Sequence, residues 1–455
     1  MDNKNQKKYY CGTLVYTVSS LVVLFVWLLG GDFAWAMKDR AIVPAATLLI
    51  RQFGVSDLVY SLIIISFPNF TNIFLTPIIS YISDRHRGRF GRRIPFLAFT
   101  TPFIVAGSIG LGFVPMLAKF FSENFTQISY NSWALIWFGL FWIFMDFGTT
   151  LSGALSGALI NDVVPQELLG RFYGLFRAVS LLAGMIFNWY LMGLIESYYL
   201  YIFTGVGVLY GIGLTMLCLK VKEGEYPSLE EEFAGQNKSG NIFKPIFTYF
   251  KQCFSHPYYL LVMVALTLSC FISVPYNMYA ILYAKELNVD MDIYGKICAS
   301  IYLLSFIVSF PLGILADKFH PLRTSIVGAI FYLFSMIAGL IFVRDAKSFL
   351  IILALHTFLS GCYFTVSASL PQRLFPRALF AQFNSAFGMI LALGNTLFGM
   401  LFGFILDSSN RNYKLVFVFA IVVIVGAISA LLAVLKKFKL LGGDQNYNPP
   451  LPSQK

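Results

Sequence analysis

Long apolar runs, separated by short polar breaks, follow one another along the whole chain. A helix needs about 20 predominantly apolar residues to cross the hydrocarbon core of a bilayer, and twelve runs are near or above that length. The pattern predicts an all-α integral membrane protein with twelve transmembrane helices. The predicted segments are 13–50 (long and interrupted), 57–82, 94–117, 131–159, 172–195, 199–219, 257–284, 293–316, 323–343, 348–372, 379–406 and 413–435.

Composition argues against the soluble classes of protein. Hydrophobic residues make up 58% of the 455 residues and charged residues only 12%, whereas ordinary globular chains carry about 25% charge. We therefore expect no soluble enzyme, nucleic-acid binder or disordered scaffold. The six cysteines are scattered without a C-x-x-C motif or a cysteine–histidine cluster, so the sequence indicates no disulfide framework, no metal site and no cofactor.

The net charge of +11 reflects topology. Of the 33 lysines and arginines, 23 fall in the two termini and in the loops on the same side of the membrane, and 8 fall on the opposite side. Cytoplasmic loops carry the excess of basic residues in membrane proteins. Both termini are therefore predicted to be cytoplasmic, and a nucleic-acid partner is not needed to explain the charge.

A long polar break from Lys220 to Ser255 separates six predicted helices from six more. Residues 165–172 are similar to residues 376–383, 211 positions later, and the loop residue Asp84 has a counterpart in Asp317. Two parallel six-helix repeats with a substrate site between them near the midplane are a known transporter architecture. The predicted organisation is an N-terminal bundle (1–220), a cytoplasmic central loop (221–255), a C-terminal bundle (256–438) and a cytoplasmic tail (439–455).

The loop between the second and third helices carries the most specific motif. Residues 83–96 read S-D-R-H-R-G-R-F-G-R-R-I-P-F. This loop resembles the D-R-x-x-x-R-[WF]-G-[KR]-[KR]-x-P-[WF] loop of the glycoside-pentoside-hexuronide:cation symporters and the related sucrose-proton symporters, within the major facilitator superfamily. Residues 31–34, the pair Met145–Asp146 and the segment around Arg177 also resemble the melibiose-carrier branch.

The motif predicts a gate on the cytoplasmic side. Asp84 ends the second helix beside several arginines, and such ion pairs can form and break as the two halves rock. The alternative is that the arginines only anchor the loop on the cytoplasmic side. The predicted gating residues are Asp84, Arg85, Arg89, Arg92, Arg93 and the repeat counterpart Asp317.

Ionisable residues inside the predicted helices indicate a cavity, because charge is costly in the bilayer. Asp32, Trp35 and Asp39 recur at helical spacing and share one face of the first helix. The alternative is a structural ion network, for example between Asp146 and Arg177. The predicted substrate and coupling residues of the N-terminal half are Asp32, Trp35, Lys38, Asp39, Arg40, Trp142, Asp146 and Arg177.

The C-terminal half has fewer charges and more hydroxyl and amide groups, which suit a hydroxyl-rich ligand. Tyr276 is predicted to offer its ring to a sugar, as are Trp35 and Trp142. His356 completes the predicted site, although an interhelical hydrogen bond is the more common role for a single buried histidine. Glycine stripes that include Gly153 and Gly157 predict close helix packing.

One departure from the resembled family concerns the coupling ion. Sodium-coupled melibiose carriers place two acids in the second helix, where this chain has Asn72 and Thr76. We therefore expect a proton rather than sodium as the coupling cation, although facilitated diffusion stays open.

The resemblance implies a multi-pass transporter of the cell (inner) membrane, a proton-coupled symporter of a sugar or glycoside that works by alternating access. A transporter of lysolipids or organic anions and a non-transporting membrane sensor are the alternatives. No H-E-x-x-H motif, histidine cluster or nucleophile with a base indicates an enzyme.

Overall fold

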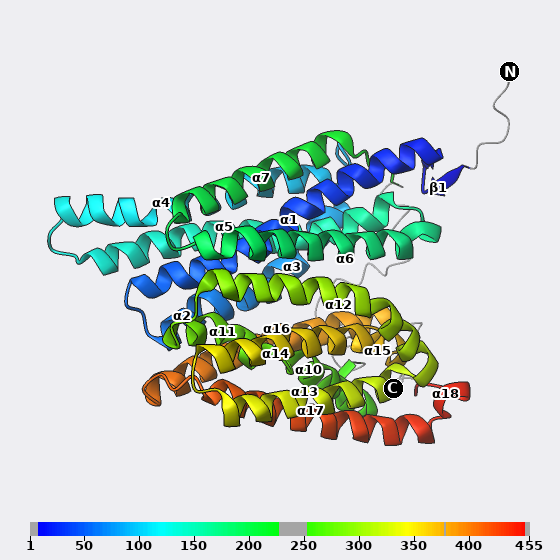
Figure 1. Cartoon of the computed structure of the whole chain (residues 1–455). Helices are drawn as coiled ribbons and strands as arrows, with labels where there is room; N and C mark the ends of the chain where they lie inside the picture. Colours follow the sequence, from blue (N-terminus) through cyan, green and yellow to red (C-terminus); the bar gives the residue numbers. More distant parts are fainter. Residues whose placement is uncertain (1–7, 227–252, 377–378, 451–455) are drawn as a thin grey trace. The chain divides into compact units, whose positions relative to one another are not determined.

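The computed structural model describes residues 8–226, 253–376 and 379–450 (Figure 1). Within these residues, twelve helical spans are long and apolar enough to cross a membrane, which confirms the predicted helical fold. The chain divides into two compact units, residues 1–236 and 237–455, which are described separately below. Most of the predicted central loop, residues 227–252, lies outside the described residues, as does the end of the predicted tail, residues 451–455.

Unit 1 contains a short hairpin and six membrane spans. The second and fifth spans each consist of consecutive helical pieces, where the sequence predicted single helices. The elements are β1 (Tyr9–Cys11), β2 (Leu14–Tyr16), α1 (Val18–Gln52), α2 (Asp57–Tyr60), η1 (Ser61–Ser66), α3 (Phe67–Arg85), α4 (Ile94–Asn124), α5 (Tyr130–Val163), η2 (Gln166–Leu168), α6 (Leu169–Ile186), η3 (Phe187–Leu191), η4 (Met192–Leu194) and α7 (Tyr199–Lys220).

The prediction for the first segment, 13–50, was wrong in two respects. β1 and β2 pair as an antiparallel hairpin, so the helix begins later, at Val18. Gly12 in the hairpin turn has a φ of +55°, which glycine adopts at little steric cost. The helix is also uninterrupted, because α1 continues through Gly30, Gly31 and Pro44 to Gln52.

Glycine in α1 serves close packing. A Cβ at Gly31 would collide with the side chain of Leu217 on α7, and a Cβ at Gly213 on α7 would lie 2.6 Å from Cβ of Ala34. The two helices therefore approach each other through reciprocal small residues, as in many membrane helix pairs. α4 packs on α5 and α7, and α6 packs on α1. Apolar side chains of these helices form one core, against which residues of the hairpin also pack.

Unit 2 also has six spans, and its described residues contain no hairpin. Its first span breaks between α10 and α11, where Pro275 occupies the first turn of α11. Proline is tolerated at that position because the missing N–H has no helical partner there. The elements are α10 (Pro257–Phe271), α11 (Val274–Glu286), α12 (Met291–Phe319), α13 (Pro321–Phe342), α14 (Ala346–Ser367), α15 (Leu370–Leu374), α16 (Phe380–Ser408), α17 (Leu415–Leu440) and α18 (Gly443–Asn446).

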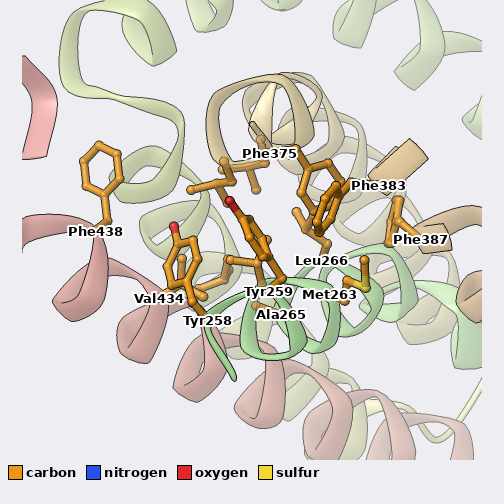
Figure 2. Close-up of a cluster of buried hydrophobic side chains, with 14 of the residues drawn as sticks. Tyr258, Tyr259, Met263, Ala265, Leu266, Phe375, Phe383, Phe387, Val434 and Phe438 are labelled. Atoms are coloured by element: carbon orange, nitrogen blue, oxygen red, sulfur yellow. The ribbon is translucent and has the colours of Figure 1, made fainter. Parts of the chain in front are cut away.

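The core of unit 2 is rich in aromatic rings. Figure 2 shows Tyr259 between Tyr258 and Phe383, with Phe375 beyond, and the ring centroids of Tyr259 and Phe383 are 4.4 Å apart. Tyr258 donates to or accepts from the hydroxyl of Tyr447 at 2.6 Å, which ties the segment after α18 to the start of α10.

Candidate functional site

Asp32 and Trp35 of α1 line a cavity of about 200 Å³ inside unit 1. Their spacing of three residues puts both on one helix face, as the sequence predicted. The opposite wall comes from α5, where Gly153 and Gly157 leave room for the Trp35 ring and the cavity. These two glycines therefore open space rather than tighten helix packing, which corrects the prediction for them. Apolar and aromatic residues complete the lining, including Tyr173 and Phe176 of α6.

The Asp32 carboxylate is buried but incompletely bonded. Its Oδ2 atom is inaccessible and has no hydrogen-bond partner among the described residues. Buried polar atoms usually have a partner, so an orphaned carboxylate oxygen in a cavity wall is a candidate acceptor for a ligand hydroxyl or a site of protonation.

Lys38 lies about one helical turn after Trp35 on α1 and is almost completely buried. Its Nζ is 2.8 Å from Oδ1 of Asp39, donates to Oγ1 of Thr149 on α5 at 3.2 Å, and lies 4.2 Å from the centroid of the Trp35 ring. The side chain of Asp39 is 51% exposed and that of Lys38 only 3%. The positive charge is thus held in place by a carboxylate, a hydroxyl and an aromatic face.

Asp146 of α5 is buried on the same helix as Thr149. Its Oδ2 accepts a hydrogen bond from Oγ1 of Thr71 on α3 at 2.7 Å. Among the described residues it makes no ion pair with Arg177, whose side chain is exposed on α6. The alternative of an Asp146–Arg177 pair is therefore not supported. Arg40 is half-buried, and neither arginine is among the residues that line the cavity.

Two of the aromatic residues predicted for the site lie outside the Asp32 cavity. Trp142 is buried against Phe138, with ring centroids 5.8 Å apart, and is not among the cavity residues. Tyr276 is completely buried in unit 2, where its ring stacks on His356 with centroids 4.0 Å apart. Helical spacing shows which residues share one face of a helix, but it does not distinguish a cavity wall from a packed interior.

His356 belongs to a neutral hydrogen-bond network in unit 2. Its Nε2 is 2.9 Å from Oδ1 of Asn277, and its Nδ1 is 2.7 Å from the hydroxyl of Tyr332. An imidazole that donates from Nε2 and accepts at Nδ1 satisfies both contacts without a net charge. The geometry fits the interhelical interpretation of this histidine.

The arginine-rich loop forms a compact ion-pair network at the ends of α3, α4 and α5. Arg93 pairs with Asp84, contacts Oδ2 of Asp162 through Nε at 3.2 Å, and donates to Oγ of Ser83 at 2.5 Å. Arg92 binds the same Asp162 with two contacts of 2.7 and 3.1 Å. Asp162 is the penultimate residue of α5, where the helix dipole disfavours a negative charge, so the two arginines stabilise an otherwise unfavourable acid.

Glu223, just after α7, closes this network from another part of the chain. Its carboxylate accepts hydrogen bonds from the backbone N–H groups of Arg92, Arg93 and Ile94 at 2.8 to 2.9 Å and from the hydroxyl of Tyr226 at 2.7 Å. These N–H groups begin α4 and have no helical acceptor. Burial, together with the adjacent charge of Glu223, raises the pKa of Tyr226, which keeps the phenol a donor.

The three other residues predicted for the gate have different surroundings. Arg85 stacks on the ring of Tyr81 at 3.6 Å. Arg89 is exposed and, in the described part of the chain, lies outside the network around Asp84 and Asp162. In unit 2, Asp317 is 3.5 Å from Arg373 at the surface.

The two side chains at the positions expected for a sodium site form a hydrogen bond with each other. The hydroxyl of Thr76 donates to Oδ1 of Asn72, so the oxygen that could face a cation already accepts a hydrogen bond. Neither side chain carries a negative charge.

The family model of the Major Facilitator Superfamily matches residues 16–295 and 271–445 of this chain. The chain belongs to the major facilitator superfamily. It is therefore a multi-pass membrane transporter and not an enzyme, as the sequence predicted.

Two curated relatives within the superfamily carry a transport name. "Sucrose transport protein SUT2" of Oryza sativa subsp. indica is 24% identical over 164 residues, which are 34% of this chain and 32% of the rice protein. The protein of the same name from Oryza sativa subsp. japonica matches with the same values. The chain thus matches about a third of the length of these relatives.

Solved structures of the superfamily share the fold over nearly the whole chain. A D-xylose-proton symporter is similar with a TM-score of 0.64 at 15% identity, covering 96% of this chain and 99% of that chain. A bacterial homolog of the human lysosomal transporter Spinster, in an inward-facing and occupied conformation, gives 0.64 at 15% identity, with coverages of 93% and 97%.

Four polar residues that hold other side chains of unit 1 in place were not predicted from the sequence. Thr149 and Thr71 hold the Lys38 and Asp146 side chains, and Asp162 and Glu223 hold the loop arginines. Asp162 carried a weak signal, since it is an acid at the end of an apolar helix. Glu223 carried none, because nothing in a single glutamate after α7 points to the N–H groups at the start of α4, 130 residues earlier.

Proposed function

We propose that the protein is a proton-coupled symporter of a sugar or glycoside that works by alternating access. The observation that carries this proposal is the pairing of Asp32 and Trp35 in one cavity wall, with a carboxylate oxygen of Asp32 left without a protein partner. A carboxylate accepts hydrogen bonds from substrate hydroxyls, and an indole ring offers an apolar face to the C–H groups of a sugar. Ligand sites commonly combine apolar walls with a few polar groups of this kind.

The comparisons support a sugar as substrate. The rice relatives are named as sucrose transport proteins, and one structural neighbour is a D-xylose-proton symporter. The match to the rice proteins is partial and the structural identity is low, so sugar specificity rests on the cavity residues together with these names.

A neutral substrate fits the charge arrangement of unit 1. Lys38 is already bound to Asp39 and Thr149, so its ammonium group does not need an anionic substrate as a partner. Asp146 is held by Thr71. The proposed coupling group is Asp32 or Asp146, which take up and release a proton, and the mutual bond of Asn72 and Thr76 disfavours sodium.

The cytoplasmic placement of both termini and the location in the cell (inner) membrane belong to the same proposal, supported by the distribution of basic residues. In this orientation, the Asp84–Arg93–Asp162 network lies on the cytoplasmic side and acts as a gate that must rearrange in each transport cycle.

Uptake into proteoliposomes tests the proposal. The purified protein is reconstituted and supplied with radiolabelled sucrose, xylose, melibiose, a lysolipid or a dicarboxylate, with a pH gradient or a sodium gradient. Accumulation of a sugar driven only by the pH gradient is the expected result. Accumulation of the lysolipid or the dicarboxylate instead would replace the substrate class. Binding of a sugar without flux would identify a membrane sensor.

A further inference from the structure

A second cavity of unit 1, distinct from the one lined by Asp32, opens beside the arginine-rich loop. Its volume is about 740 Å³. The walls are the loop from Arg87 to Gly91, the start of α4, the end of α7 and the segment from Val221 to Tyr226 that follows α7.

Three basic side chains line this cavity. Arg87 donates to the carbonyl oxygen of Asp84 at 2.7 Å and lies 5.7 Å from the Tyr226 ring. Arg89 and Lys222 are exposed, and in the described part of the chain neither forms an ion pair or a side-chain hydrogen bond. Two cations that form no ion pair among the described residues thus face one cavity.

The acids around the cavity do not cancel this charge. The carboxylate of Glu223 lines the cavity and keeps its charge, but its oxygens already accept hydrogen bonds from the N–H groups of Arg92, Arg93 and Ile94 and from Tyr226. Glu225 also lines the cavity and is exposed. Among the described residues that line the cavity, Arg87, Arg89 and Lys222 therefore outnumber Glu223 and Glu225 by one charge, which leaves the lining net positive.

The cavity is also amphipathic. Phe90 and Leu219 line it and are 71% and 68% exposed. Leu219 is the next-to-last residue of a membrane span, so the mouth lies near the end of a transmembrane helix. Cations near the ends of membrane helices, next to apolar surface, are the arrangement that binds phosphate headgroups.

We propose that this cavity is a binding site for a phosphate group, held by Arg89 and Lys222. A bound phosphate bridges the loop that carries the gate arginines to the segment that carries Glu223. The same chemistry is supplied by the headgroup of an anionic phospholipid and by a soluble phosphate compound. The site does not depend on the proposed sugar substrate.

The test uses the full-length protein in nanodiscs of phosphatidylcholine. Phosphatidylglycerol is added as the lipid probe, and bound lipid is counted by native mass spectrometry. Inorganic phosphate is the soluble probe, and its binding is measured by equilibrium dialysis with radiolabel. Arg89→Gln/Lys222→Gln removes the two unpaired cations, and Lys436→Gln/Lys437→Gln removes two exposed cations at the end of α17 as a matched control.

The loop variant should weaken binding about 30-fold, because each basic group near the membrane surface contributes roughly fivefold in affinity to an anionic lipid. The control should bind within about twofold of wild type, because its two cations do not line the cavity. Glu225→Gln should strengthen binding by about fivefold, a change of sign that damage to the fold does not produce. If the loop double variant fails to fold, Arg89→Gln and Glu225→Gln give the same opposed pair of effects.

Loss of phosphatidylglycerol alone in the loop variant assigns the site to a lipid headgroup, and loss of inorganic phosphate binding assigns it to a soluble compound. Equal binding in wild type and loop variant, an equal loss in the control, or no binding of either probe to the wild type would overturn the proposal.

Discussion

The α3–α4 end of unit 1 and the corresponding α12–α13 end of unit 2 use the same residue types in opposite ways. In unit 1, Arg93 is 7% exposed and Asp162 is 14% exposed, and two arginines share the acid. In unit 2, Arg373 and Asp317 are 52% and 76% exposed and meet at 3.5 Å.

The 211-residue shift that relates the two repeats places Asp162 on Arg373, so the charge at this position is reversed. α12 is followed by a single residue, His320, before α13 begins, whereas eight residues, 86–93, separate α3 from α4. Unit 2 therefore has no arginine loop, and its acid pairs directly with Arg373. The tight ion-pair network is thus a property of one repeat.

The membrane spans of the two units also differ in the charged side chains that they bury. Unit 1 buries Asp32, Lys38 and Asp146. Unit 2 buries His356 and Tyr332, whose neutral network also includes the exposed Asn277. These buried charges therefore lie in unit 1, whereas the network around His356 in unit 2 is uncharged.

Removing the arginine of each network should separate the two ends most clearly. Arg93→Ala removes the partner of Asp84 and one of the two arginines that hold Asp162. It should lower the free energy of unfolding by about 2 kcal/mol, since the charge-assisted hydrogen bonds of a buried guanidinium are lost. Arg373→Ala removes an exposed pair and should cost less than about 1 kcal/mol. Denaturant titration in detergent micelles measures both. Equal losses would erase the distinction between the two ends.

Substitution of the two corresponding acids, Asp84 and Asp317, tests whether the two ends also differ in function. Asp84→Asn should slow substrate exchange about tenfold, equivalent to about 1.4 kcal/mol in a barrier, with KM nearly unchanged, because the network lies at the helix ends and away from the Asp32 cavity. Asp317→Asn should exchange at the wild-type rate. Exchange rates in proteoliposomes provide the measurement, and a wild-type rate for Asp84→Asn would leave the loop as an orientation signal only.

A smaller effect is expected for the neutral network. His356→Phe removes two interhelical hydrogen bonds and should lower the free energy of unfolding by about 1 kcal/mol, given the modest value of such bonds in membranes. Stability should fall equally at pH 6 and pH 8, because the network is neutral in the wild type. A loss confined to one pH would show that His356 exchanges a proton.

The twelve spans could be predicted because length and apolarity alone determine which segments cross a bilayer. The hairpin of residues 9–16 could not, since its three-residue strands are too short to leave a periodic signal. The break between α10 and α11 had a local signal in Pro275, but apolar content on both sides concealed it.

The site was predictable only as far as one helix face determines it. Asp32 and Trp35 could be placed together from their spacing, and the structure puts both in one cavity wall. The spacing of Tyr276 does not show that its ring packs on His356, and its predicted contact with a sugar stays a prediction. Asp162 and Glu223 were missed because their partners are about 70 and 130 residues away in sequence.

The most direct test of the account compares one acid of unit 1 with the histidine of unit 2 in the same assay. Asp32→Asn and His356→Gln are reconstituted, and pH-gradient-driven sugar accumulation and equilibrium exchange are measured side by side. The account predicts that Asp32→Asn exchanges sugar but no longer accumulates it, because exchange needs no net proton release, while His356→Gln keeps the wild-type ratio of accumulation to exchange. If His356→Gln loses accumulation and keeps exchange, while Asp32→Asn accumulates normally, then coupling resides in unit 2 and the central claim is wrong.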